Sequence, residues 1–319
     1  MDFRDIIEKN KLFIISSHIG PDGDNVSSSL AFKLALQELG KEAYYVIDDK
    51  LPQNLSFLRD YDKQMTSEKI EGYLEGKEYV FIGLDCGVID RLKISDKVFK
   101  NSSYVINIDH HEQNEMYGDY NFVDVNMSST CELVYHHLKK YYPQCLTKDI
   151  ATCLYAGILT DTGNFMYDCA DSTTLMAASD LLEKGADRTT IVNCIFRSQD
   201  ENYLKLLSEV LSTIQVDGIL ATAYLKKDML KRHHISYNDV ENLVDYVINI
   251  HGVRMGILFK EKDINEIKLS IRSKGDLDVA SFARKYGGGG HKNAAGCSFA
   301  GLLEDVMESV INNAREYVL

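Results

Sequence analysis

Three apolar segments of this chain each lead into side chains that could bind a metal ion or transfer a proton. They cover 13–17, 81–84 and 104–108 and are followed by His18, Asp22 and Asp24, by Asp85, and by Asp109, His110 and His111. Carboxylates and imidazoles are common ligands of divalent cations. Strands of a parallel α/β sheet bring their carboxyl ends to one crevice. The pattern therefore predicts a divalent-cation site and a metal-dependent phosphoester hydrolase.

The adjacent histidines are the residues that a purely structural role explains least well. Neighbouring side chains on an extended chain point to opposite faces, so His110 and His111 can perform different tasks. One can ligate a metal while the other donates to a phosphate oxygen. Two further pairs, 136–137 in a helical pattern and 233–234 in a polar stretch, are expected to have surface or packing roles.

Taken one at a time, the carboxylates allow structural interpretations. Asp22 and Asp24 stand in a Pro-Asp-Gly-Asp stretch, which is also typical of a solvated loop turn. Asp85 and Asp161 could each cap the element beside them. All four stand at boundaries of predicted strands or helices, as the histidines do. That coincidence favours one shared site over separate turns and caps.

The segments that would position these groups alternate between strands and helices. Expected strands cover 12–17, 42–47, 79–85 and 104–109, and expected helices cover 27–39, 129–142, 148–159 and 172–183. This alternation predicts a doubly wound, mainly parallel α/β sheet. A second set of elements, which includes one over 238–249 and a hairpin over 253–272, predicts a smaller mixed α/β domain. The expected organisation is a metal-binding domain over 1–187, a helical connector over 188–216 and a substrate-binding domain over 217–319.

Composition narrows the class of protein further. A length of 319 residues suits two domains, and no apolar run is long enough for a membrane span. A cytoplasmic protein without a membrane partner is therefore expected. The net charge of −13 argues against binding long nucleic acid, but it allows a short anionic substrate. The seven cysteines include no CxxC pair and are expected to be reduced thiols.

The motifs resemble the signature blocks of the DHH phosphoesterase superfamily, in order and almost end to end. The matching residues are His18, Asp22, Asp24, Asp85, Asp109, His110, His111 and Asp161. The run from Gly287 to Gly296 resembles the glycine-rich block of the associated DHHA1 type of domain. The combination is similar to stand-alone oligoribonucleases and 3′-phosphoadenosine 5′-phosphate phosphatases, called nanoRNases, and equally to di-adenylate phosphodiesterases. After Asp24 the chain departs from the pattern, with Asn25-Val-Ser-Ser where Ala-Ile-Gly-Ser is usual.

The resemblance implies a role for each matching residue. One manganese ion would be held by His18, Asp22 and Asp85, and a second by Asp24, Asp85, His110 and Asp161. His111 would contact the scissile phosphate, and Asp109 would orient the imidazoles. The expected catalytic residues are thus Asp85, His110 and His111. Substrate would be bound by His111, Arg272, Gly288, Gly289, Gly290 and His291. The expected cofactor is two Mn²⁺ ions, with Mg²⁺ or Co²⁺ as substitutes.

The expected reaction is hydrolysis of short oligoribonucleotides or dinucleotides to nucleoside 5′-monophosphates, with 3′-phosphoadenosine 5′-phosphate as a second substrate. The alternative is a phosphodiesterase specific for linear pApA or cyclic di-AMP. The glycine-rich block disfavours an inorganic pyrophosphatase, and the filled ligand positions leave a non-catalytic nucleotide sensor as a remote alternative. A second copy of the chain is a candidate partner, and long nucleic acid is not expected to bind.

Overall fold

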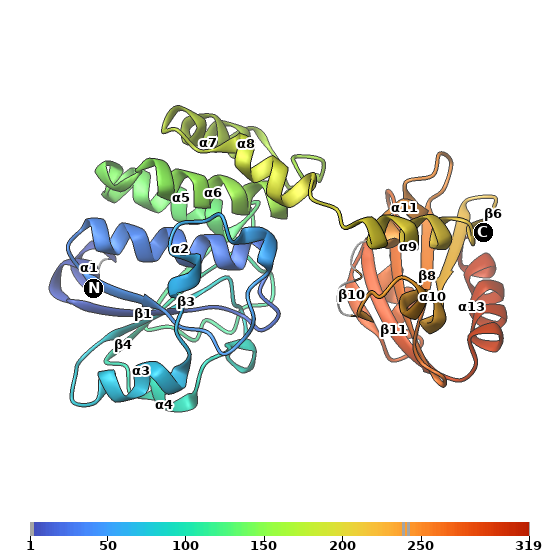
Figure 1. The fold of residues 1–319 in the computed structure, drawn as a ribbon, viewed down its shortest axis with the longest axis horizontal. Helices are drawn as coiled ribbons and strands as arrows, with labels where there is room; N and C mark the ends of the chain where they lie inside the picture. Colours follow the sequence, from blue (N-terminus) through green and yellow to red (C-terminus); the bar gives the residue numbers. More distant parts are fainter. Residues whose placement is uncertain (1–2, 238–239, 241–242, 319) are drawn as a thin grey trace. The chain divides into compact units, whose positions relative to one another are not determined.

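The chain folds into two compact units, shown in the computed structural model of Figure 1. The structure describes residues 3–237, 240 and 243–318. The first unit extends to Ser198 and the second begins at Gln199. Each unit has its own sheet and its own apolar cores. The predicted fold class, a parallel α/β domain followed by a mixed α/β domain, is confirmed.

The sheet of the first unit contains five parallel strands in the order β2-β1-β3-β4-β5. They are β1 (Leu12–Ser16), β2 (Glu42–Tyr45), β3 (Val80–Leu84), β4 (Tyr104–Asp109) and β5 (Tyr120–Val123). The strands β1 and β3 are buried along their whole length, which explains their continuous apolar sequences. Because the strands are parallel, the residues that follow β1, β3 and β4 share one edge of the sheet.

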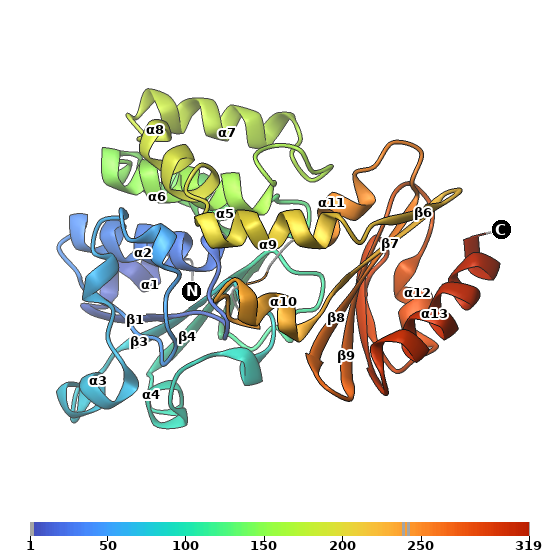
Figure 2. The same cartoon turned by 45° about the vertical axis from the view of Figure 1, so that its right-hand side comes forward.

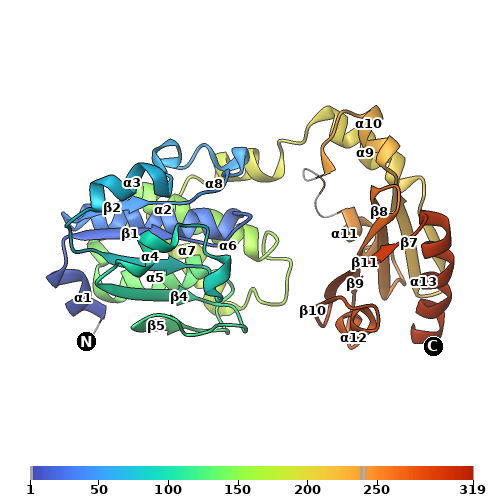
Figure 3. The same cartoon turned by 90° about the horizontal axis from the view of Figure 1, so that it is seen from below.

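Helices cover both faces of this sheet, as Figures 1 and 3 show. On one face, α1 (Phe3–Lys9), α2 (Gly23–Glu38) and α5 (Thr130–Tyr141) lie against the sheet, and α6 (Lys148–Asp161) and α7 (Ser172–Glu183) pack on these helices. The other face packs against α3 (Ser67–Leu74) and α4 (Asp96–Lys100). Short 3₁₀ turns cover Gln53–Leu55, Tyr61–Lys63, Ile89–Arg91 and Pro143–Cys145, and α8 (Arg188–Ile191) leads into a π-helical turn at Val192–Phe196. The apolar residues of the parallel strands are thereby buried on both faces.

The helices α2 and α6 pack so closely that two positions require glycine. A Cβ atom on Gly23, the first residue of α2, would lie 2.3 Å from Oγ1 of Thr160. A Cβ atom on Gly157 of α6 would lie 2.7 Å from Oδ1 of Asp24. These glycines let the first turn of α2 approach the last turns of α6. Two acidic residues, Asp24 and Asp161, are thereby brought to the same edge of the sheet.

The second unit is built on a six-stranded mixed sheet in the order β10-β11-β9-β8-β7-β6, part of which Figure 2 shows. Its strands are β6 (Gln215–Asp217), β7 (Leu220–Leu225), β8 (Met255–Asp263), β9 (Glu266–Ser273), β10 (Gly289–His291) and β11 (Ala294–Ala300). One face packs against α9 (Glu201–Leu211), α10 (Lys227–Arg232) and α11 (Leu243–Ile248). The other packs against α12 (Val279–Arg284) and α13 (Leu303–Val318). This unit therefore has three layers.

The structure differs from the predicted elements in ways that matter for the site. The helix α2 begins at Gly23 because Asp22 caps it, so Asp24 lies in its first turn and not on a loop. The helix α6 continues to Asp161. Part of the glycine-rich block is strand, since Gly289–His291 pairs with β11. Of the element predicted over 238–249, some residues lie outside those that the structure describes.

Two simpler expectations concern the membrane and the cysteines. Within the described ranges, no helix combines the length and the apolar character that crossing a bilayer requires. All seven cysteines are free thiols, and five of them are buried. This arrangement agrees with the expectation of reduced thiols.

Candidate metal centre

The predicted acidic residues and histidines of the first unit gather where β1, β3 and β4 end. Side chains from five separate elements or loops contribute, because the first turn of α2 and the last turn of α6 reach the same edge. Three groups each have ligand atoms within 4.8 Å of one another: His18, Asp22 and Asp85; Asp24, His110 and Asp161; and Asp85, His110 and His111. The sequence signal at each element boundary therefore converges on one place.

Asp85 lies between the first two groups. It follows β3 in a left-handed backbone conformation, with φ of 54°, and its amide donates to the carbonyl of Ile108 over 3.0 Å. Its Oδ2 lies 3.4 Å from Nε2 of His18, and its Oδ1 lies 3.6 Å from Nε2 of His110. The two oxygens of this one buried carboxylate thus face different groups, which is the geometry of a bridging ligand.

The group around His18 is oriented by backbone contacts. Nδ1 of His18 lies 2.9 Å from the carbonyl of Ile19, and a proton shared there fixes the imidazole with Nε2 as its free ligand atom. That nitrogen lies 3.7 Å from Oδ2 of Asp22. The other oxygen of Asp22, Oδ1, accepts from the amide of Asn25 and caps α2. Each of these two side chains thus has one atom bound to the backbone and one atom directed toward the other members of the group.

The second group combines Asp24, His110 and Asp161. Asp24 is 1% exposed, and its two oxygens accept from the amides of Thr130 (2.7 Å) and Cys131 (2.9 Å) at the start of α5. Nδ1 of His110 lies 3.2 Å from the carbonyl of Met127, while its Nε2 lies 3.2 Å from Oδ2 of Asp161. His110 therefore repeats the arrangement of His18, with the backbone at Nδ1 and the group at Nε2, whereas both oxygens of Asp24 are bound by backbone amides.

His111 is oriented by a carboxylate instead of a carbonyl. Its Nδ1 donates to Oδ1 of Asp109 over 2.7 Å, and Oδ2 of Asp109 accepts from Nδ2 of Asn114 over 2.7 Å. The hydrogen bond to Asp109 raises the pKa of His111 to about 9, although desolvation works in the opposite direction. The side chain is 38% exposed. A protonated, accessible imidazole suits donation to a phosphate oxygen.

The electrostatics of the cluster fit a site for cations. Burial disfavours ionised Asp85, but its hydrogen bond to His18 and the charges of His110 and His111 outweigh burial and lower its pKa to about 2. Burial, followed by repulsion from Asp85, instead raises the pKa of Asp24 well above its usual range. The imidazoles therefore do not neutralise all of the buried carboxylates. Divalent cations would supply the missing charge, and oxygen-rich ligation with some imidazole suits Mn²⁺.

Several residues that hold the site were not singled out in the sequence. Thr130 contacts both Asp24 and Asp85, and Asn114 contacts Asp109. The Ser129-x-x-Glu132 spacing does mark the start of a helix. It does not reveal that this helix start faces a carboxylate from α2. For Asn114 the sequence offers no signal, since it lies in an irregular segment.

The replacement of the usual family sequence after Asp24 creates a buried polar cluster. Oδ1 of Asn25 accepts from Oγ of Ser17 over 2.6 Å and from the hydroxyl of Tyr45 over 3.3 Å. Nδ2 of Asn25 donates to the carbonyl of His18 over 3.3 Å. The start of α2 is thus preserved, and Asn25 links it to the chain segment that carries His18.

The predicted substrate-binding residues of the C-terminal half lie in the second unit. Arg272 is near the end of β9, with Nε 3.5 Å from Oδ1 of Asp245. Cβ atoms on Gly288 and Gly290 would lie 2.2 Å from the carbonyl oxygen of Gly296 and 2.4 Å from that of Ala294. Glycine therefore permits close backbone approach to β11, and His291 beside it is exposed. Among the residues described, none of these joins the three ligand groups.

The two further histidine pairs, 136–137 and 233–234, have the surface or packing roles expected of them. The ring of His137 is buried, 3.8 Å from that of Phe122 and 4.6 Å from that of Phe3. In the second unit, Nε2 of His233 lies 2.8 Å from Oε2 of Glu209, and both side chains are partly exposed. Neither pair is part of a ligand group in the described structure. Two adjacent histidines alone therefore do not predict a ligand group. The position of His110 and His111 at the end of a strand is the informative feature.

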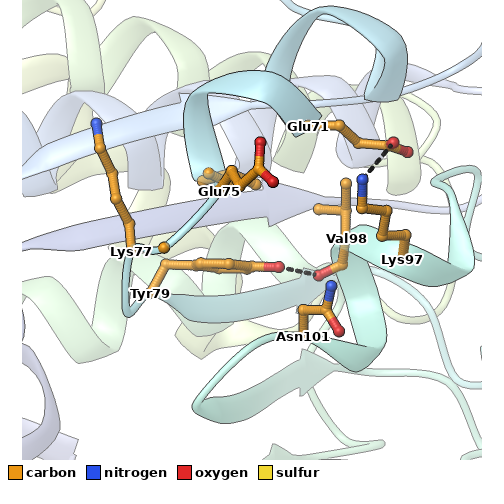
Figure 4. A pocket seen from close by; sticks show the side chains of 9 residues that line it. Glu71, Glu75, Lys77, Tyr79, Lys97, Val98 and Asn101 are labelled. Atoms are coloured by element: carbon orange, nitrogen blue, oxygen red, sulfur yellow. Dashed lines mark hydrogen bonds and ion pairs between the residues drawn. The ribbon is translucent and has the colours of Figure 1, made fainter.

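A pocket of about 460 Å³ lies away from this cluster (Figure 4). It is lined by residues of α3, α4 and the segment before β3, including Lys77 and Tyr79. Asp85 follows β3, so the pocket lies at the opposite end of that strand. The hydroxyl of Tyr79 donates to the carbonyl of Val98, and Lys97 pairs with Glu71. These polar groups are paired with one another, and the ligand cluster remains the candidate site.

Comparisons with known proteins show which proteins this chain is similar to. Residues 12–158 match the DHH family, N-terminal domain, and residues 217–319 match the DHHA1 domain. A bifunctional oligoribonuclease and PAP phosphatase NrnA from Thermus thermophilus is 33% identical, over 95% of this chain and 89% of its own length. The cyclic-di-AMP phosphodiesterase GdpP of Bacillus subtilis is 24% identical over 98% of this chain, which spans 49% of that relative. An exopolyphosphatase-related protein from Bacteroides fragilis superposes with a TM-score of 0.89 at 28% identity, covering 98% of this chain and 94% of that one.

The Asp85→Asn variant tests whether one carboxylate serves two cations. The amide keeps the shape of the side chain but loses its charge, so the affinity for Mn²⁺ should fall at both sites, by at least about 100-fold. Calorimetric titration with Mn²⁺ measures this. Asp119→Asn is the matched control, because Asp119 is exposed and its Oδ2 accepts from the backbone amide of Val105. Wild-type affinity in Asp85→Asn would remove Asp85 from the metal centre.

Proposed function

This chain belongs to the DHH family, with a DHHA1 domain following its N-terminal domain, and we propose that it is a two-metal hydrolase of short oligoribonucleotides. The products would be nucleoside 5′-monophosphates, and 3′-phosphoadenosine 5′-phosphate would be a second substrate. The observation that carries the proposal is the position of Asp85, with one oxygen toward each of two ligand groups. Similarity to an NrnA enzyme along almost the full length of both chains supports the substrate class.

Each ligand group has a task in this proposal. The first cation would be held by His18, Asp22 and Asp85, and the second by Asp24, Asp85, His110 and Asp161. When bound, a pair of divalent cations activates water and neutralises charge that develops on phosphorus. We assign the cations as Mn²⁺, with Mg²⁺ or Co²⁺ as substitutes, because carboxylates dominate the ligands and imidazoles complete them.

The remaining residues act on the substrate. His111, held by Asp109, would donate a hydrogen bond from Nε2 to a non-bridging oxygen of the scissile phosphate. That donor would stabilise the negative charge that increases during attack. In the second unit, Arg272 would bind a phosphate through its guanidinium fork, and Gly288, Gly289, Gly290 and His291 would offer backbone amides and an imidazole. The net charge of −13 disfavours long polymers, so binding would be confined to short anions.

A narrower function is the second candidate. The likeness to a cyclic-di-AMP phosphodiesterase over 98% of this chain favours an enzyme specific for linear pApA or cyclic di-AMP. The catalytic chemistry would be the same, since both reactions break a phosphodiester bond between nucleotides. The two candidates differ in whether the enzyme accepts other sequences and lengths.

A side-by-side turnover assay in Mn²⁺ separates the candidates. The substrates are pApA, cyclic di-AMP, a five-nucleotide RNA of mixed sequence, 3′-phosphoadenosine 5′-phosphate and pyrophosphate, with Asp85→Asn as the blank. We expect pApA and the RNA to be cleaved at comparable kcat/KM, with 5′-monophosphates as products. A preference for pApA or cyclic di-AMP of more than about 100-fold, which is nearly 3 kcal/mol, would establish the narrower function. Hydrolysis of pyrophosphate alone would contradict both.

The Arg272→Ala variant tests the assignment of substrate binding in the second unit. Loss of a charge-assisted hydrogen bond to a phosphate should raise KM about 10- to 100-fold and leave kcat nearly unchanged. Arg254→Ala is the control, because Arg254 is exposed in the same unit and pairs with Asp276. Steady-state kinetics on the RNA substrate measures both variants. A fall in kcat at unchanged KM would place Arg272 in the chemical step instead.

A further inference from the structure

One buried threonine contacts two carboxylates of the candidate metal centre. Oγ1 of Thr130 lies 2.9 Å from Oδ1 of Asp85, and the Thr130 amide donates to Oδ2 of Asp24 over 2.7 Å. All three residues are buried. A carboxylate accepts hydrogen bonds, so the threonine hydroxyl is the donor in this contact. Thr130 therefore contacts one residue shared by both cation groups and one residue of the second group.

We propose that Thr130 is a positioning residue, which holds the Asp85 carboxylate in the orientation that a two-cation site requires. The inference rests on the proposed function in one respect, namely that Asp85 bridges two cations. Thr130 itself would touch neither the substrate nor the reacting atoms. Its effect would pass through the two carboxylates.

The hydroxyl of Thr130 restricts the terminal side-chain torsion of Asp85. The terminal torsion of an aspartate is broad, so a carboxylate without partners can turn both oxygens toward one neighbour. The Oδ1 of Asp85 that accepts from Thr130 is also the one 3.6 Å from Nε2 of His110. The other oxygen lies 3.4 Å from Nε2 of His18. By holding Oδ1, Thr130 keeps one oxygen available to each group.

The hydroxyl of Thr130 is not needed to cap its helix. The cap of α5 is Ser129, whose Oγ accepts from the amide of Glu132 over 3.0 Å. Thr130 is the next residue, in the first turn, where the side chain has no capping task. The hydroxyl of Thr130 thus does not cap the helix, and it donates to Asp85 instead. A role in stabilising the helix does not account for it.

The start of α5 is itself held firmly, which gives the contact a rigid base. The buried carboxylate of Glu132 accepts from the amide and the hydroxyl of Ser128, at 3.1 and 2.6 Å, and from Oγ1 of Thr174 at 2.9 Å. Thr174 belongs to α7, so these bonds tie the first turn of α5 to a neighbouring helix. The helix start that carries Thr130 is therefore also held by hydrogen bonds that do not involve the metal ligands.

Two substitutions separate the hydroxyl from the rest of the side chain. Thr130→Val keeps the shape and the backbone amide that contacts Asp24, but it removes the donor to Asp85. Thr130→Ser keeps the donor and removes a methyl group. We expect Thr130→Val to weaken the binding of at least one Mn²⁺ about 10- to 100-fold and to lower kcat with little change in KM. Thr130→Ser should stay within about threefold of the wild type in both respects.

The measurements are a calorimetric Mn²⁺ titration of the metal-free full chain and steady-state kinetics on the RNA substrate. Unaltered Mn²⁺ binding and kcat in Thr130→Val would overturn the proposal, as would equal losses in both variants, which would indicate packing. If Thr130→Val does not fold, Thr130→Ala, which also lacks the donor and differs from Thr130→Ser only by the hydroxyl, takes its place under the same criteria. The titration needs no substrate, so a wild-type protein inactive on RNA would contradict the proposed function alone.

Discussion

Carboxylates that are brought together out of water repel one another, and the first unit is organised around this constraint. Asp24 and Asp85 are almost fully buried near Asp22 and Asp161. The fold offsets part of the repulsion with dipoles and imidazoles: two amides of α5 bind Asp24, and His18 lies against Asp85. What remains is an excess of negative charge, whose natural complement is a pair of divalent cations.

The elements that carry these carboxylates meet at one edge of the sheet for geometric reasons. Parallel strands bring their ends together, and close packing of α2 and α6 at Gly23 and Gly157 adds the ends of two helices. Each imidazole is then fixed by a contact at Nδ1, from a carbonyl for His18 and His110 and from a carboxylate for His111. Orientation is therefore decided before any cation or substrate binds, which reduces the ordering cost of binding.

The sequence predicts those parts of the site that depend on strand ends. An apolar run followed by Asp-His-His is informative because a buried strand restricts where its last residues can lie. The sequence is less informative for Asp24. It places Asp24 on a loop before a helix over 27–39, but the cap formed by Asp22 starts α2 at Gly23. The role of Thr130 is not predictable from the sequence because it depends on contacts with residues 45 and 106 positions away. The β10–β11 pairing was missed because glycine runs carry no strand periodicity.

The most direct test of the account is electron paramagnetic resonance of the full chain loaded with Mn²⁺. Two cations that share the Asp85 carboxylate would lie close enough for their electron spins to couple. The account predicts two Mn²⁺ per chain and a spin-coupled spectrum. One Mn²⁺ per chain, or two giving only the six-line pattern of isolated ions, would contradict the claim that a single carboxylate unites the two ligand groups.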